Sequence, residues 1–279
     1  MKNNGQRTSF LSVCNLVLIA LLAGSIPAPT IAAPRESVVN VPSRPGVTQG
    51  FYLMEPEGKP RAIAILFIGG EGELALGPDG PAKGKGNFLM RVRNQLSRAD
   101  LILAYPDVPS DQAGHGLGDF RISERHGEDI AAMVKALKAR NDLPVFLIGT
   151  SRGTISATNG AGRIDPSLVA GVILTSTVTE RSKNKQRPVF DTPLDKIRAP
   201  VLVMSHKDDT CYVTPPSDIP RLLRAMTASP RKDSLLLSGG KPPKSDPCEA
   251  FAAHGFFGIE DEAARAMTDW IASVLKSSP

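Results

Sequence analysis

The sequence contains little cysteine, little histidine and little net charge. It has 279 residues, of which three are cysteine and four are histidine, and its formal net charge is +5 at pH 7. Chains that bind nucleic acid or attach stably to membrane surfaces carry a much stronger basic excess, so we expect neither kind of partner. Internal repeats and low-complexity tracts are also absent from the sequence, and its length fits one large domain.

The long apolar run of the sequence lies at its N-terminus. A positively charged start precedes residues 10–22, which are mostly apolar, and a proline-broken segment of small residues then ends at Ala32 and Ala33. This order is typical of a secretory signal peptide that is cleaved after Ala32 or Ala33. The run is shorter than the ~20 residues of a membrane-spanning helix, which makes an uncleaved anchor the weaker alternative. We therefore expect a signal peptide at 1–33 and a secreted or periplasmic domain at 34–279.

The cysteine count bears on the redox state of the mature chain. Cys14 falls within the expected signal peptide, which leaves Cys211 and Cys248. An even number of cysteines in an exported chain indicates a disulfide bond. Two buried free thiols and a redox-controlled pair remain as alternatives.

Apolar segments alternate with amphipathic segments along the expected mature chain. We expect strands within 36–58 and at 62–68, 101–105, 145–148, 168–174, 201–204 and 234–237, and helices at 87–99, 123–140, 219–226 and 259–275. This alternation predicts an α/β fold, with a mostly parallel sheet covered by helices on both faces. Ligands of such sheets bind at the carboxyl ends of the strands, so polar residues that directly follow strands are the candidates for a site.

The most informative segment is residues 145–153, VFLIGTSRG. Four apolar residues lead directly into GTSRG at 149–153, a G-x-S-x-G pattern, and small residues that can form a helix follow it. In a strand–turn–helix elbow, such a serine lies at the tip of a sharp turn with its hydroxyl exposed. The flanking glycines avoid the clash that a Cβ would make with neighbouring backbone. Ser151 is therefore the candidate nucleophile.

A serine hydroxyl needs a base to remove its proton, and that base is usually a histidine oriented by a carboxylate. His254 is the best candidate, since it lies in a glycine-flanked loop, AHGFFG, directly before the last expected helix. His126 begins a helix and His206 follows a strand, and we interpret both as structural. His115 lies in a long polar loop at 106–121, whose length favours a functional role, and it could contact substrate.

The carboxylate candidates follow the expected strand at 201–204, in the stretch SHKDD. Asp209 is favoured over Asp208 because of its offset from the end of the strand. The resulting order along the chain is Ser151, Asp209 and His254, with each residue placed after a successive strand. This nucleophile–acid–histidine order is the one found in α/β-hydrolases.

The chain resembles the α/β-hydrolase superfamily over nearly all of its expected mature region. The resemblance is carried by the elbow at 149–153, by HKDD at 206–209 and by HGFFG at 254–258. The chain is similar in particular to an exported bacterial serine hydrolase subgroup in which an IGTSRG-type elbow, an HxDDxC-type acid loop and a CEAxxxHGFxGIE-type histidine loop occur together. In this chain the three segments read IGTSRG, HKDDTC and CEAFAAHGFFGIE. The resemblance implies an α/β-hydrolase fold, a serine nucleophile, acyl transfer to water, and no metal or cofactor.

Acyl transfer also needs two backbone N–H donors for the oxygen that becomes negatively charged, an arrangement called the oxyanion hole. We expect one donor from Arg152, the residue after the nucleophile, and the other from the loop after the strand at 62–68. Gly70 and Glu71 are both candidates in that loop, which reads GGEG and lacks the histidine of the His-Gly version.

Three cationic or titratable side chains, those of Arg121, Arg152 and His115, could meet near the mouth of the pocket and bind a substrate carboxylate or another anion. The alternative, which we favour, is that Arg152 caps local carbonyl groups and that Arg121 pairs with Asp119 or Glu124. The sequence alone leaves both interpretations open.

The sequence thus predicts a serine hydrolase that cleaves a small-molecule acyl ester through an acyl-enzyme. The segment at 175–199 is too short for the large helical lid of many lipases, so we expect a minimal lid and an open site. The alternatives are an exported peptidase or amidase with the same triad, an acyltransferase, and a non-catalytic binding protein on the same fold.

Overall fold

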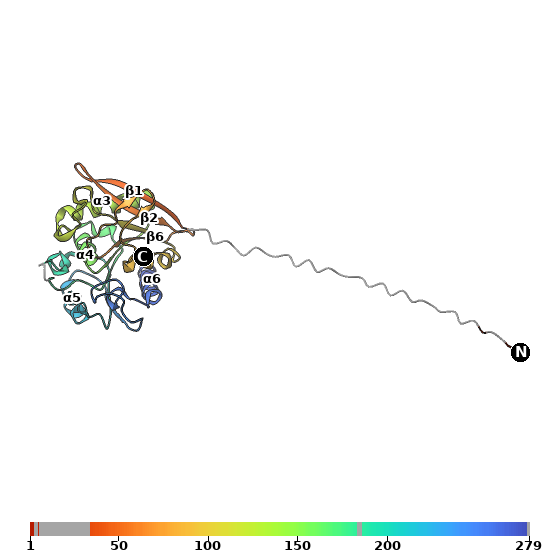
Figure 1. Ribbon diagram of the computed structural model, residues 1–279. Helices are drawn as coiled ribbons and strands as arrows, with labels where there is room; N and C mark the ends of the chain where they lie inside the picture. The colour runs from red at the N-terminus through yellow and green to blue at the C-terminus, as the bar shows by residue number, and fades with distance from the viewer. Residues whose placement is uncertain (3–4, 6–33, 183–185, 278–279) are drawn as a thin grey trace. The chain divides into compact units, whose positions relative to one another are not determined.

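The computed structural model of the chain describes residues 1–2, 5, 34–182 and 186–277 (Figure 1). The expected signal peptide, residues 1–33, lies almost entirely outside the described residues. The described residues from 34 onward belong to one compact unit. None of the described helices is both long and apolar enough to cross a bilayer.

A central sheet is built from strands that match the apolar runs of the sequence. Its members are β1 (Arg35–Arg44), β2 (Val47–Glu55), β3 (Ala62–Phe67), β6 (Leu101–Pro106), β7 (Val145–Thr150), β8 (Gly171–Thr175), β9 (Val201–His206) and β10 (Lys232–Leu237). They lie in the order β1-β2-β6-β3-β7-β8-β9-β10. The pairs β1–β2 and β2–β6 are antiparallel, and the later pairs are parallel. The mostly parallel sheet that the sequence predicts is therefore confirmed.

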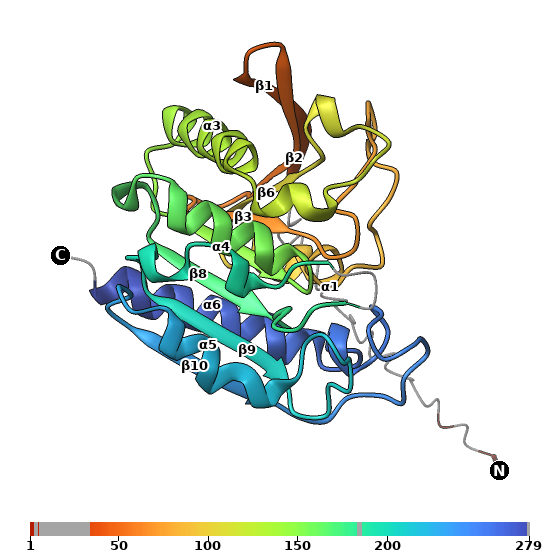
Figure 2. The same ribbon diagram turned by 90° about the vertical axis from the view of Figure 1, so that its left-hand side faces the viewer.

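Helices cover both faces of this sheet. One face carries α3 (Glu124–Arg140), α4 (Gly153–Arg163) and α5 (Ile219–Ala225), and the other carries α1 (Phe88–Arg91), α2 (Arg93–Ser97) and α6 (Glu260–Ser277) (Figure 2). The longest helix of the first face, α3, begins where the sequence predicts it, because the Ser123 hydroxyl accepts a hydrogen bond from the His126 N–H at 3.1 Å.

The core lies in two layers, one on each side of the sheet. In β7, Leu147 packs into the layer under α3 and α4, whereas Phe146 and Ile148 pack into the layer under α6. Phe146 meets Trp270 of α6 edge-on, with ring centroids 6.3 Å apart. Full burial of one such side chain is worth about 1.5–3 kcal/mol. The two layers together fix the carboxyl ends of the strands, where the polar loops begin.

Two elements differ from the sequence expectations. The strand expected at 168–174 begins only at Gly171, because Asp165 accepts a hydrogen bond from the Ser167 N–H and, with Pro166, starts a 3₁₀ turn instead. The helix expected at 87–99 is divided into α1 and α2 at Val92.

The segment between β8 and β9 carries no helical lid in its described part, which excludes 183–185. It contains two short 3₁₀ turns, Val189–Asp191 and Leu194–Lys196. The carboxyl end of the sheet is therefore bordered by loops.

Candidate active site

Ser151 lies at the tight turn between β7 and α4, in a left-handed backbone conformation with φ of +51°. Such a conformation costs a non-glycine residue about 1–3 kcal/mol and persists only where surrounding contacts enforce it. Here the Ser151 N–H donates to the carbonyl of Thr175 at 3.0 Å, and the Thr154 hydroxyl donates to the carbonyl of Ser151 at 2.6 Å. This is the geometry of a nucleophile elbow.

The glycines on either side of Ser151 are required by close backbone contacts. A Cβ on Gly149 would lie 2.5 Å from the carbonyl oxygen of Gly153. A Cβ on Gly153 would lie 2.0 Å from the carbonyl oxygen of Phe67, the last residue of β3. Both distances are far below van der Waals contact, as the G-x-S-x-G pattern predicts.

His254 and Asp209 contact each other. His254 Nδ1 lies 3.1 Å from Asp209 Oδ2, and the exposed fractions of the two side chains are 5% and 0%. The Thr214 hydroxyl donates to the same carboxylate oxygen at 2.9 Å and lies 3.1 Å from His254 Nδ1. The N–H of Cys211 donates to Asp209 Oδ1 at 2.9 Å. With Nδ1 directed at the carboxylate, Nε2 is the ring nitrogen available as a base.

The neighbouring aspartate and histidine have a different arrangement. The side chain of Asp208 is 65% exposed. The ring of His206 is buried, with Nε2 2.9 Å from the carbonyl oxygen of Gly239 and Nδ1 3.0 Å from the N–H of Asp208. Both nitrogens of His206 therefore serve the local structure, and Asp209 is the aspartate that contacts His254.

The loop that carries His254 is held by a disulfide and by an arginine. Cys248 is bonded to Cys211, which lies two residues after Asp209. Arg91 of α1 donates to the carbonyl oxygen of Ala250 at 2.9 Å and to that of Gly255 at 2.6 Å. The acid loop and the histidine loop are thus fixed to each other and to the helix below them.

Ser151 and His254 line a common cavity of about 490 Å³. This volume lies within the ~300–1,000 Å³ of small-molecule sites. The wall is formed by residues 68–73, 83–84, 86–88, 150–151, 248–250 and 254–255. The loop after β3 therefore faces the nucleophile, as the sequence predicts.

The loop after β3 is a tight turn in which the Gly72 N–H donates to the carbonyl of Gly69 at 3.3 Å. Gly70 adopts a φ of +58°, which favours glycine. A Cβ on Gly69 would lie 3.1 Å from the Cβ of Ser151, so this turn passes directly beside the nucleophile. Gly70, Glu71 and Arg152, the three expected oxyanion donors, all belong to these two adjacent turns.

The structure does not assemble the anion site considered for Arg121, Arg152 and His115. Arg152 forms an ion pair with Glu71, and among the described residues its side chain donates to no backbone carbonyl, so the expectation that it caps local carbonyl groups is wrong. His115 is exposed, and within the described part of the chain it is not among the residues that line the cavity.

Arg121 contradicts both interpretations made from the sequence. Its side chain is buried and is not part of the described cavity wall, so it does not reach a substrate. It does not pair with Asp119 or Glu124 either. Its guanidinium donates to the carbonyl oxygens of Ile68 and Gly70 and to the Ser156 hydroxyl. These partners are distant in sequence, whereas the acids next to Arg121 in the chain suggested a local pair.

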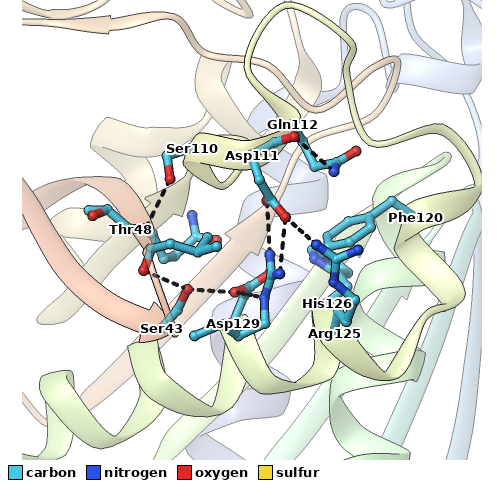
Figure 3. Close-up of polar contacts among 12 residues, drawn as sticks. Ser43, Thr48, Ser110, Asp111, Gln112, Phe120, Arg125, His126 and Asp129 are labelled. Carbon is cyan, nitrogen blue, oxygen red and sulfur yellow. Dashed lines mark hydrogen bonds and ion pairs between the residues drawn. The ribbon is translucent and has the colours of Figure 1, made fainter.

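The part of the long loop at 106–121 that contains Asp111 is anchored by a partly buried ion-pair network (Figure 3). Arg44, in the β1–β2 hairpin, donates two hydrogen bonds to Asp111 at 2.9 and 3.0 Å and two to the buried Asp129 at 2.8 and 3.0 Å. The ring of Phe120 lies under the guanidiniums of Arg44 and Arg125. The loop that supplies Arg121 is therefore held to α3 and to the hairpin.

Two residues of the site were missed in the sequence. Thr214 contacts both His254 and Asp209, and Arg91 holds the histidine loop. Neither is marked by a flanking glycine or by a position directly after a strand. The five-residue distance from Asp209 to Thr214 was the one available signal, and it is meaningful only once the turn at Cys211–Thr214 is known.

No protein-family model matches the chain, and no curated protein matches its sequence. Solved structures do match. An esterase from Pyrococcus furiosus is 12% identical with a TM-score of 0.62, over 87% of this chain and 92% of that one. A dienelactone hydrolase from Anabaena variabilis is 14% identical with a TM-score of 0.58, over 87% and 99%. A serine α/β-hydrolase without a lid from Xanthomonas campestris is 13% identical with a TM-score of 0.56, over 90% and 99%.

The strand order, the elbow and these likenesses show that the chain has the α/β-hydrolase fold. The fold class expected from the sequence is confirmed. The narrower resemblance to an exported subgroup with a GTSRG elbow remains a prediction.

Proposed function

We propose that this protein is a serine hydrolase that cleaves small-molecule carboxylic esters. The observation that carries the proposal is that a strained elbow serine and an aspartate-paired histidine line the same cavity. The likeness to solved esterases supports it at the level of the fold. No group of three or more metal-binding side chains occurs among the described residues, and the proposed reaction uses none.

The reaction follows from the roles of the three side chains. His254 Nε2 takes the proton of the Ser151 hydroxyl as the oxygen attacks the acyl carbonyl, and Asp209 stabilises the imidazolium through Nδ1–H. The amides of Arg152 and of the Gly70–Glu71 turn hold the oxyanion. His254 then protonates the leaving alcohol. In the second half, His254 activates water, which releases the acid and frees Ser151.

We also propose that the mature protein is secreted or periplasmic, after removal of residues 1–33. The Cys211–Cys248 disulfide supports an oxidising compartment. N-terminal sequencing of the protein recovered from the periplasm or the medium of its host tests the cleavage after Ala32 or Ala33.

The nucleophile is tested with the Ser151→Ala variant. We expect normal folding and a loss of ester turnover of at least about 10³-fold, because the remaining groups supply only binding and oxyanion stabilisation. Labelling by a fluorophosphonate probe should disappear in the same variant. Ser167→Ala, which changes an exposed serine in the 3₁₀ turn before β8, is the matched control and should keep both properties. Unchanged esterase activity of the Ser151→Ala protein would disprove the mechanism.

The same preparation separates the proposed activity from its alternatives. Matched ester and amide substrates compared side by side distinguish an esterase from a peptidase or amidase. Addition of an alcohol acceptor reveals an acyltransferase through a second product. Absence of labelling in the wild-type protein would instead indicate a non-catalytic binding protein.

A further inference from the structure

Arg121 is a buried cation placed directly behind the loop that is expected to hold the oxyanion. Its side chain lies on a 3₁₀ turn, Gly118–Ile122, and its exposed fraction is 1%. Nη2 donates to the carbonyl oxygens of Ile68 and Gly70, both at 3.2 Å. Nη1 donates to the Ser156 hydroxyl of α4 at 2.6 Å. The same guanidinium therefore connects the loop after β3 to the helix that follows Ser151.

The fit around this guanidinium is close. Gly72 has a φ of +76°, and a Cβ at this position would lie 2.5 Å from Arg121 Nη2. The turn from Gly69 to Gly72 thus packs against the guanidinium with no space for a side chain at position 72. Leu117, from the same long loop as Arg121, adds a hydrogen bond of 2.9 Å from its N–H to the carbonyl of Glu71.

The bond to Gly70 fixes the direction of one amide. In a trans peptide unit the C=O and N–H groups point in opposite directions, and the described chain has no cis peptide bond. The peptide unit that contains the Gly70 carbonyl also contains the Glu71 N–H. Because the carbonyl points at Arg121, the Glu71 N–H points away from it. Residues 69–73 line the Ser151 cavity and Arg121 does not, so this direction is that of the cavity.

The charge of Arg121 is costly where it lies. No described carboxylate lies within ion-pair distance of it, and its Nε is buried without a hydrogen-bond partner among the described residues. Burial, and then the nearby Arg152, lower its pKa to about 9. Arg91 differs, because its guanidinium has Glu260 as a partner. A buried cation without a carboxylate partner destabilises the fold, which points to a role other than stability.

We propose that Arg121 is a positioning residue for the oxyanion hole, and that the amide it orients is that of Glu71. The guanidinium acts through the peptide unit: it holds the carbonyl in place, and its charge polarises the unit so that the N–H becomes a stronger donor. The proposal rests on the proposed function, since an oxyanion forms only if Ser151 attacks an acyl group.

The test compares an ester with its thionoester, in which sulfur replaces the carbonyl oxygen. Sulfur is a poor hydrogen-bond acceptor, so the thionoester gains little from the oxyanion hole. Loss of one oxyanion donor costs about 10²–10³-fold in other serine hydrolases. Since Arg121 acts through one donor, we expect Arg121→Met to lower kcat/KM for the ester by about 10–100-fold. The thionoester should change by less than about threefold, because it does not depend on the oriented donor.

The Arg121→Lys variant keeps a cation, but the lysine side chain cannot reach all three acceptors. The ratio of kcat/KM for the ester to kcat/KM for the thionoester should therefore fall by an intermediate amount, about 3–10-fold. Arg140→Met changes an exposed arginine at the end of α3, is the matched control, and should keep the wild-type ratio. Circular dichroism and thermal unfolding show which variants are folded. If Arg121→Met does not fold, the lysine variant decides.

If Arg121 had a purely structural role, its replacement would lower kcat/KM for the ester and for the thionoester in parallel. A folded variant that keeps the wild-type ratio of these two kcat/KM values would overturn the proposal. If the wild-type protein hydrolyses neither substrate, the proposed function fails and this inference fails with it. If the wild-type protein is active and Arg121 variants keep its ratio, only the inference fails.

Discussion

Two arginines, the half-buried Arg91 and the buried Arg121, hold the loops of the site through backbone carbonyl groups. Arg91 contacts the carbonyls of Ala250 and Gly255 in the histidine loop, and Arg121 contacts those of Ile68 and Gly70 in the loop after β3. An arginine offers five donors in a rigid fork, so one side chain can satisfy several carbonyls at once. At the scale of single residues, the site depends on cations that do not line its cavity.

His126 gives a prediction about pH. It is buried in α3 with Nε2 2.9 Å from the Ser156 hydroxyl, and burial, with smaller contributions from Arg121 and Arg44, lowers its pKa to about 3. Between about pH 6.5 and 3, the unfolded chain binds a proton at this residue and the folded chain does not. Stability is therefore lost as the pH falls. From pH 6 to pH 4 the free energy of unfolding should decrease by about 2–3 kcal/mol from this group alone.

Urea unfolding of the wild-type protein and of His126→Gln at pH 6, 5 and 4 measures this contribution. The variant keeps a side chain able to bond Ser156, and it lacks the titrating group. Other acids titrate in both proteins, so the difference between the two curves isolates His126. Parallel curves would mean that His126 is protonated in the folded state.

The catalytic candidates could be found from the sequence because their signals are local. Ser151 is flanked by glycines after an apolar run, and Asp209 and His254 each belong to a short motif beside an expected element. Arg121 could not be found, because its three partners lie 35, 51 and 53 residues away along the chain. The nearby acids Asp119 and Glu124 suggested an ion pair with Arg121, but in the folded chain its guanidinium donates to backbone carbonyl groups instead.

At the scale of elements, the disulfide connects the loop after β9 to the loop before α6. The sequence separation of Cys211 and Cys248 is 37 residues. The loop after β9 carries Asp209, and the N–H of Cys211 donates to that carboxylate. The bond therefore joins the two segments whose relative position sets the contact between Asp209 and His254.

The double variant Cys211→Ser, Cys248→Ser should lose about 3–4 kcal/mol in the free energy of unfolding, because a loop of this length is no longer closed in the unfolded chain. Its kcat/KM for esters should fall by about tenfold, since Asp209 and His254 are held less exactly. Urea unfolding and ester kinetics measure the two effects. Reductant should convert the wild-type protein to the same behaviour and leave the variant unchanged. An unchanged free energy of unfolding would contradict the account.

The strands were predictable from the sequence because both faces of the sheet are covered, which makes β3, β7 and β9 continuous apolar runs. The start of β8 was not predictable from the sequence, because the turn at Asp165–Ser167 competes with strand formation through a local hydrogen bond. The exact helix boundaries near Val92 were also missed. Leu89, Val92 and Leu96 keep a helical spacing across the division, so the spacing did not mark it.

At the scale of the whole molecule, the cavity is bordered by loops with no helical lid in the described part of 176–200. An enzyme without a lid does not need a lipid–water interface to open its active site. We expect a preference for short, soluble acyl esters, with kcat/KM at least about tenfold lower for chains of twelve or more carbons, because the cavity is of ordinary small-molecule size. A panel of esters from two to sixteen carbons measures this, and rates should follow simple saturation past the solubility limit. A preference for emulsified long-chain esters would refute it.

The contact between Gly153 and Phe67 has a consequence for how this protein can diversify. With 2.0 Å between a hypothetical Cβ and the Phe67 oxygen, position 153 accepts no side chain unless the start of α4 moves away from the end of β3. We therefore expect substrate preference to be altered by substitutions of residues that line the cavity, such as Glu73 and Glu249, and not by substitutions at this contact.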